Sequence, residues 1–397
     1  MNAPSTSASR IPGLDGVRGL AILSVLYWHF FASQRHVGSP AIVHLMERAG
    51  RLSWAGVDLF FVLSGFLIGG ILMRNRDSPD LLRVFYARRV LRIFPVYFAW
   101  LAAFYALRAL CGGHLRSAWL FGFPLPGWSY LTFTQNFVMA AHRFWGAHWL
   151  APTWSLAVEE QFYLILPLLV LVLRPRALAA LSLLLVLSAP FIRHSLLLRG
   201  NEVGALVLLQ TTWDLLFIGV IGAYLFQPGT PAVLRPSRRL LLHGALLASV
   251  ALCAACIALP RLINLWLASL LPTFVGLLSL ALIGFAIYSP WRSLLAGRWL
   301  VGLGRISYGI YIFHEGIYGL LYAAAHRGQA GTGEPMTLSW LDVDTVVLSL
   351  GITVALAMLS FRYFESPLIE LGKRLHYARE APPAAPGPPE CTVPRQR

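Results

Sequence analysis

Long apolar runs separated by short polar segments make up most of this chain. A run of about 20 apolar residues is long enough to cross the hydrocarbon core of a bilayer as a helix. Runs of about that length lie at 12–33, 53–73, 92–111, 153–173, 177–198, 204–226, 240–259, 264–288, 299–325 and 338–361. The pattern predicts an all-α protein, a polytopic integral membrane bundle of about ten transmembrane helices.

A further apolar stretch, 126–141, is short and contains Gln135 and Asn136. Two side-chain amides are costly in lipid unless other protein groups satisfy them. We therefore predict a re-entrant or interfacial segment here rather than another span.

The basic residues support this count. The net charge of +15 would indicate nucleic-acid binding in a soluble protein, but 57% of the residues are hydrophobic and only 12% are charged. Basic residues gather in alternate connecting segments: Arg74, Arg76, Arg83, Arg88, Arg89 and Arg92, then Arg174 and Arg176, Arg235, Arg238 and Arg239, Arg292 and Arg298, and Lys373, Arg374 and Arg379. The positive-inside rule then predicts a protein of the cytoplasmic membrane with both termini in the cytoplasm and no nucleic-acid partner.

The same patterns predict one domain with two tails. We expect a cytoplasmic tail over 1–11, a membrane domain over 12–370, and a cytoplasmic, Pro-rich and largely disordered tail over 371–397. Cys253 and Cys256 lie in an apolar span without further ligands at metal-site spacing, so we expect packing there and no metal.

The first span carries the most informative polar pair, Arg18 and His29, eleven residues apart. At about 100° per residue they point the same way, and they lie about 16 Å apart along the helix. Ionisable residues inside a membrane helix are usually functional, so the pair predicts an elongated site along the membrane normal. Asp15, three residues before Arg18, is most simply its local ion-pair partner.

The stretch ARRVLRIFPVYF (87–98) is the strongest candidate for binding an anion. Arg88, Arg89 and Arg92 fall within about one turn of helix and could converge on phosphate groups, for which arginine forks are well suited. Ordinary positive-inside anchoring is the alternative. Pro95 favours a kinked or unwound entrance.

Three other apolar spans contain polar residues of interest. The second has Asp58 at its start, then Ser64, with Gly65 and Gly69 forming a small-residue packing face. Further site candidates lie in TWSLAVEEQFYLILP (153–167) and GRISYGIYIFHEGIY (304–318): Trp154, Glu159, Tyr163, Tyr308 and His314. A structural ion pair is the alternative role for Glu159, and a hydrogen-bonded structural role is the alternative for His314.

Together these stretches resemble the acyltransferase-3 family of integral-membrane acyl transferases. The matching pieces, in the family's order, are LDGVRGLAILSVLYWHF, GVDLFFVLSGFLIG, ARRVLRIFPVY, TWSLAVEEQFYLILP, ISYGIYIFH and YFESP. The resemblance implies transfer of an acyl group from cytoplasmic acyl-CoA to a hydroxyl at or beyond the membrane. It also implies that Arg18 and His29 match the family's essential Arg and His, Arg89 and Arg92 its paired arginines, and Glu159 its carboxylate. Some members carry an extracytoplasmic hydrolase-like domain, which we do not expect here.

A mechanism follows as a hypothesis. His29 would act as general base and Glu159 would orient its ring, while Arg18 and the cluster Arg88, Arg89 and Arg92 would hold acyl-CoA, most simply acetyl-CoA, as a co-substrate. No permanently bound cofactor is expected. The acceptor would be an extracytoplasmic glycan, a lipid-linked sugar or a small-molecule natural product. A proton-coupled transporter or flippase is the alternative class.

Overall fold

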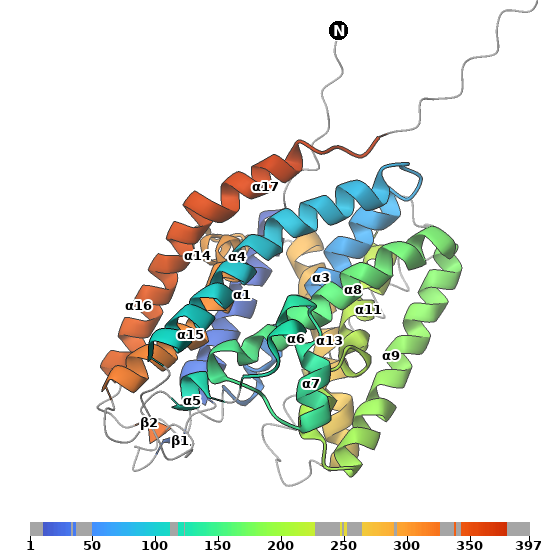
Figure 1. Ribbon diagram of the computed structural model, residues 1–397. Helices are drawn as coiled ribbons and strands as arrows, with labels where there is room; N and C mark the ends of the chain where they lie inside the picture. Colours follow the sequence, from blue (N-terminus) through green and yellow to red (C-terminus); the bar gives the residue numbers. More distant parts are fainter. Residues whose placement is uncertain are drawn as a thin grey trace, which may run out of the picture.

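The computed structural model describes residues 11–32, 35–36, 50–111, 118–122, 124–226, 247, 250–251, 264–289, 292–325, 337–338 and 343–378. Most of this part of the chain is helical, and the helices pack side by side (Figure 1). Seven of the described helices are long and apolar enough to cross a membrane. The polytopic helical architecture is thereby confirmed. The predicted span 240–259 and its two cysteines lie almost entirely outside the described residues, so the count of ten stays a prediction.

The hydrophobic runs mark most of these helices closely, and their bounds are as follows: α3 (Ala55–Arg74), α4 (Leu81–Cys111), α8 (Trp154–Val172), α9 (Pro175–Leu198), α10 (Glu202–Val207), α11 (Leu209–Leu225), α13 (Leu265–Tyr288), α16 (Val343–Ser360) and α17 (Ser366–Lys373). The largest difference is α4, which begins eleven residues before the predicted 92 and continues through Pro95 without a break. The Arg cluster is therefore part of a long helix, and no unwound entrance forms.

Two predicted spans are divided into shorter helices. The first consists of α1 (Pro12–Tyr27) followed by a π-helical turn, η1 (Trp28–Ala32), and 299–325 consists of α14 (Arg298–Arg305) and α15 (Ser307–Ala325). A second π-turn, η8 (Phe361–Glu365), joins α16 to α17. Such π-turns are frequent at functional sites, and η1 carries His29.

The segment 126–141 forms two short helices, α6 (Gly127–Leu131) and α7 (Gln135–His142), neither of which can cross a bilayer. Its amides are satisfied inside the protein, because Gln135 donates to the Thr153 carbonyl (2.9 Å) and Asn136 to the Val207 carbonyl (3.1 Å). The remaining short elements are η2 (Gly50–Leu52), α5 (Ala118–Phe121), η4 (His148–Thr153), η6 (Arg292–Leu294) and the parallel two-residue strands β1 (Arg35–His36) and β2 (Thr337–Leu338).

Close packing of α3 on α11 organises the core. A Cβ at Gly65 would overlap the Leu216 carbonyl, and one at Gly69 would lie 3.4 Å from the Val220 Cα, so the two helices run parallel with their backbones in near contact. The predicted small-residue face is confirmed as a helix interface.

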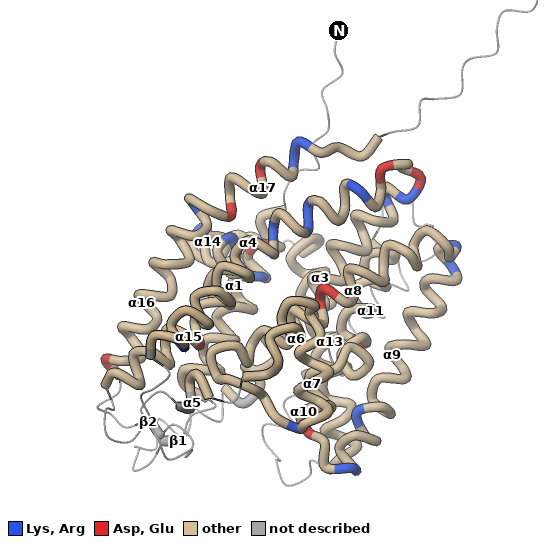
Figure 2. The backbone as a smooth tube through the Cα atoms, viewed as in Figure 1, with Lys and Arg blue, Asp and Glu red and all other residues tan. Residues whose placement is uncertain are grey.

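Charge is distributed unevenly between the ends of the bundle. Lys and Arg are concentrated at the end where α4 begins and α17 ends, and fewer lie at the opposite end, where α9 ends (Figure 2). We refer to these as the basic end and the opposite end. The two candidate cavities lie between the basic end and the opposite end.

Candidate active site

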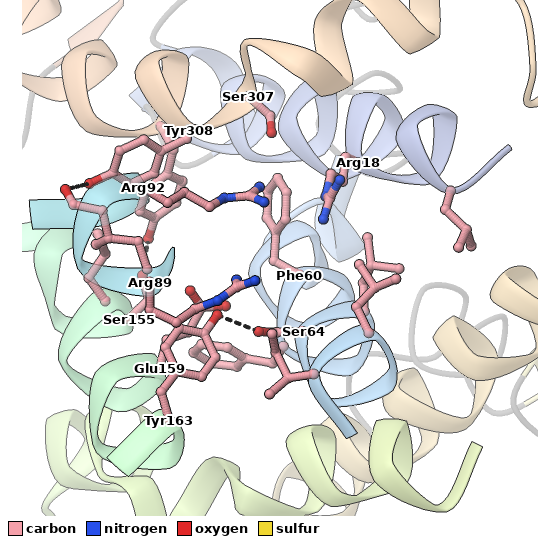
Figure 3. Close-up of a pocket in the computed structure, with 18 of the residues that line it drawn as sticks. Arg18, Phe60, Ser64, Arg89, Arg92, Ser155, Glu159, Tyr163, Ser307 and Tyr308 are labelled. Atoms are coloured by element: carbon pink, nitrogen blue, oxygen red, sulfur yellow. Dashed lines mark hydrogen bonds between the residues drawn. The ribbon is translucent and has the colours of Figure 1, made fainter. Parts of the chain in front are cut away.

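The first cavity, of about 610 Å³, lies among α1, α3, α4, α8 and α15. Four arginines line it: Arg18, Arg74, Arg89 and Arg92. The guanidinium groups of Arg18, Arg89 and Arg92 point into the same space from two helices (Figure 3). Among the described residues, two carboxylates, Asp15 and Glu159, line the same cavity, so this lining carries an excess of positive charge. A polyanion such as a phosphorylated ligand fits this chemistry.

Asp15 and Arg18 form the local pair that their spacing predicts. Arg18 Nη1 lies 3.1 Å from Asp15 Oδ1. The Asp15 side chain is 3% exposed whereas that of Arg18 is 21% exposed, so the carboxylate is the buried support and the guanidinium is the accessible group.

Glu159 lines this first cavity, whereas His29 lines the second, so the structure does not bring the two predicted partners into one cavity. Glu159 instead interacts electrostatically with Arg92 and Arg89. Arg92 is eleven residues from the start of α4, about 16 Å along the helix axis. The hydroxyls of Ser64 and Tyr163, 2.6 Å apart, line the same wall (Figure 3).

Arg88, which the sequence predicts to share the anion site, is not among the residues that line the first cavity with Arg89 and Arg92. Its Nε donates to the Gly372 carbonyl (3.2 Å), its Nη2 donates to the Leu375 carbonyl, and its guanidinium lies 5.0 Å from the centre of the Tyr377 ring. One residue along a helix changes direction by about 100°, which turns Arg88 towards the end of α17. Arg88 therefore anchors the segment that follows α17.

The second cavity, of about 870 Å³, lies towards the opposite end. Aromatic side chains make up much of its lining: Trp28, Trp54, Phe144, Trp145 and Trp154. Its acidic and basic lining residues come from five elements of the chain: His29, Asp58, His148, Arg193 and Glu315. Apolar walls with a few convergent polar groups are typical of sites for small molecules and saccharides.

Within this cavity, Glu315 lies between two imidazoles. Its Oε1 is 3.5 Å from His29 Nε2, and its Oε2 is 2.6 Å from His148 Nε2. The Glu315 side chain is only 5% exposed. His29 Nδ1 lies 2.9 Å from the Val25 carbonyl oxygen, which can only accept, so Nδ1 carries the hydrogen and Nε2 carries the lone pair of the neutral ring.

His314 lies directly behind this pair. It is completely buried, its Nδ1 is 2.7 Å from the Tyr311 carbonyl, and its ring centre lies 4.9 Å from that of His29. Ligand atoms of His29, His314 and Glu315 all lie within 4.8 Å of one another, and two His with one carboxylate could hold Zn²⁺. The expectation of a site without a metal remains a prediction.

Asp58, Trp154 and Tyr308 complete the predicted candidates. Asp58 and Trp154 line the second cavity, near a buried pair in which Arg193 Nη2 lies 2.6 Å from Asp214 Oδ2. Asp58 Oδ2 is buried and has no hydrogen-bond partner among the described residues. Tyr308 lines the first cavity and donates to the Ile93 carbonyl (2.7 Å).

The first span contributes ionisable side chains to both cavities: Asp15 and Arg18 of α1 to the first, and His29 of η1 to the second. Two side chains, Val57 and Tyr311, line both cavities and therefore form the wall between them. The expectation of one elongated site along α1 is thus refined to two cavities that meet between Arg18 and His29.

Sequence reasoning did not assign roles to Glu315, His148, Val57 or Tyr311. A carboxylate next to His314 inside an apolar helix was the available signal for Glu315. His148 precedes α8 in a Trp-containing turn, η4, whose packing on α15 has no signal in the hydropathy pattern.

Comparison with known proteins shows which proteins this chain is similar to. A family model described as an acyltransferase domain matches residues 11–362. A Bacillus subtilis protein, YrhL, provisionally named a peptidoglycan O-acetyltransferase, is 28% identical over 385 residues, which cover 92% of this chain and 56% of that protein. The O-acetyltransferase OatA of Staphylococcus aureus is 24% identical over 380 residues, covering 91% and 58% respectively. The chain thus spans less than three fifths of these relatives. No solved structure matches it.

Proposed function

The chain belongs to the acyltransferase-3 family, and from this premise we propose that it transfers an acetyl group from acetyl-CoA at the basic end of the bundle to a hydroxyl of a glycan at the opposite end. The observation that carries the proposal is the pair of cavities meeting at Val57 and Tyr311, one lined by arginines and the other by the His29–Glu315 pair. Acyl transfer between substrates on two sides of a membrane requires both kinds of site and a short distance between them.

The first cavity is suited to the donor. The phosphates of CoA are strongly anionic, and Arg18, Arg89 and Arg92 present their guanidinium groups from two helices to one space (Figure 3). The acyl-pantetheine arm is a narrow, flexible chain, and its methylene and methyl groups suit the route past Phe60 and Leu63 in the same lining towards the wall. By the positive-inside rule, the basic end and both termini would face the cytoplasm, where CoA thioesters are found.

The second cavity is suited to the acceptor and to the chemistry. Neutral His29 would take the proton of the acceptor hydroxyl on Nε2 as the oxygen attacks the thioester carbonyl. The C–S bond then breaks, and the CoA thiolate receives a proton from the imidazolium. Glu315, 3.5 Å from that nitrogen, stabilises the charged imidazolium while it exists.

The acceptor is proposed to be a carbohydrate. The apolar faces of pyranose rings pack well on indole rings, and four tryptophans line the second cavity. Asp58 and His148 would accept and donate hydrogen bonds to sugar hydroxyls. The name of the Bacillus subtilis relative, YrhL, points to peptidoglycan as the acceptor of that protein.

The test uses the full chain in lipid nanodiscs with radiolabelled acetyl-CoA and a soluble peptidoglycan fragment. We expect release of free CoA thiol and labelled, base-labile O-acetyl sugar. His29→Ala should abolish both while the protein still binds CoA, and His142→Ala, an exposed histidine on α7, serves as the matched control. A wild-type protein that moves substrate across vesicles but never consumes acetyl-CoA would overturn the proposal in favour of a transporter.

A further inference from the structure

Val57 and Tyr311 are the only side chains that line both cavities in the described part of the chain. Val57 is in the first turn of α3, and Tyr311 is in the second turn of α15. The acyl group must come into reach of His29 from the first cavity, so it has to pass or occupy the position of this wall. The wall therefore has a direct influence on the transferred group.

The Tyr311 half of the wall is held by hydrogen bonds. Its hydroxyl lies 2.6 Å from the Ser155 hydroxyl and donates to the Pro152 carbonyl (3.0 Å). Ser155 lines the first cavity and Pro152 the second, so the phenol is fixed across the boundary. The Phe60 ring packs edge-on against it at 6.4 Å.

The Val57 half is held by helix packing. Its neighbour Gly56 is pressed against α1, where an added Cβ would lie 2.6 Å from the Ala21 carbonyl oxygen and 2.9 Å from the Val25 nitrogen. These contacts fall between Arg18 and His29 on α1. The backbone of Val57 cannot retreat, so the size of its side chain sets the space that remains beside Tyr311.

We propose that Val57, against the fixed ring of Tyr311, limits the size of the acyl group that this protein transfers. The proposal rests on the proposed acyl transfer and adds its donor specificity. Tyr311 is buried and Val57 is half-buried, and both are held in place by the contacts described above. Extra methylenes on the acyl chain would therefore overlap these two side chains rather than displace them. One methylene misfitted in an apolar pocket changes specificity by about 10–200-fold.

The test compares acetyl-CoA, propionyl-CoA and butyryl-CoA as donors in the nanodisc assay, with kcat/KM measured for each. Val57→Ala removes two carbon atoms, the number by which butyryl exceeds acetyl. We expect it to raise the butyryl-to-acetyl ratio by about tenfold or more. Val57→Ile adds one carbon and should lower the propionyl-to-acetyl ratio.

The matched control is Val62→Ala, the same truncation on the same helix. Val62 is buried on the face of α3 that packs against Gly276 of α13 and lines neither described cavity, so the donor ratios should match the wild type. Ratios unchanged in both Val57 variants, while the wild type transfers acetyl, would overturn the size limit. A wild type that transfers no acyl group would instead overturn the proposed function. Val57→Ala and Val57→Ile are expected to change the preference for longer donors in opposite directions. The proposal can therefore still be tested if one of the two variants folds poorly.

Discussion

His29 and Glu315 lie next to each other in the lining of the second cavity, with 3.5 Å between His29 Nε2 and Glu315 Oε1. They come from η1 and α15, which are far apart in the sequence, and the Val25 carbonyl fixes the orientation of the imidazole. The carboxylate thus approaches the nitrogen that would gain a proton. The Glu315 side chain is only 5% exposed, so an ion pair formed there during the reaction would be stronger than the same pair in bulk water.

Glu315→Gln is therefore expected to lower kcat by about 10²-fold or more, because the imidazolium loses its counter-charge. The measurement is the initial rate of CoA release at saturating acetyl-CoA. Glu202→Gln, at an exposed position on α10, is the control. A Glu315→Gln variant as fast as the wild type would show that the carboxylate has no part in transfer.

Arg89→Ala and Arg92→Ala are expected to raise the KM for acetyl-CoA by about tenfold or more each, since a hydrogen bond to a charged group contributes about 1.5–3 kcal/mol. Arg88→Ala is an informative comparison one residue away. Because Arg88 bonds the carbonyls of Gly372 and Leu375 instead of lining the cavity, its loss should lower thermal stability and leave this KM unaltered. Equal KM effects for Arg88 and Arg89 would contradict the assignment.

Glu159→Gln distinguishes the two carboxylates. Glu159 is next to Arg92 and Arg89, so its neutralisation should alter the KM for acetyl-CoA through those arginines. The pH dependence of kcat should stay as in the wild type, because the proposed general base, His29, lines the other cavity. A shifted pH profile for Glu159→Gln, with none for Glu315→Gln, would restore Glu159 as the partner of His29.

The sequence was sufficient for the helices and for the separate depths of Arg18 and His29. Long apolar runs determine membrane helices almost alone, since no other structure satisfies the backbone in lipid. Individual partners were harder to predict. Glu159 and His29 were predicted to be partners, but the structure places them in different cavities, and hydropathy carries no signal for which helix faces which cavity. The apolar run near 92 also concealed the start of α4 at Leu81. Arg88 and Arg89 are neighbours whose side chains leave α4 in directions about 100° apart. Which of the two faces the cavity depends on where α17 packs against α4.

The α3–α11 interface offers a test of the fold that is independent of activity. Gly65→Val should lower the free energy of unfolding by about 1–3 kcal/mol or more, because the new side chain meets the Leu216 carbonyl and the helices cannot separate without losing their packing. Gly351→Ala on α16, where an added Cβ meets nothing within 4 Å, is the control. Thermal unfolding in detergent measures both. An unaltered melting temperature for Gly65→Val would contradict this interface.

The cluster of His29, His314 and Glu315 leads to a prediction about metal ions. Their ligand atoms lie within 4.8 Å of one another, and both imidazoles have Nδ1 directed at a backbone carbonyl, which leaves Nε2 as the ligand nitrogen. Zn²⁺ bound there would occupy the lone pair that His29 needs as a base. Added Zn²⁺ should therefore inhibit transfer, and a chelator should restore it.

His314→Gln distinguishes inhibition by Zn²⁺ bound at this cluster from inhibition by Zn²⁺ bound elsewhere on the protein. Because His314 would supply one ligand and is not itself the base, the variant should retain transfer activity and require a higher Zn²⁺ concentration for inhibition. His194→Gln is the control, since His194 stacks on Trp266 at a ring distance of 3.6 Å and lines neither described cavity. Activation by Zn²⁺, with loss of that activation in His314→Gln, would instead mean that the acceptor site works as a metal centre and that His29 acts as a ligand.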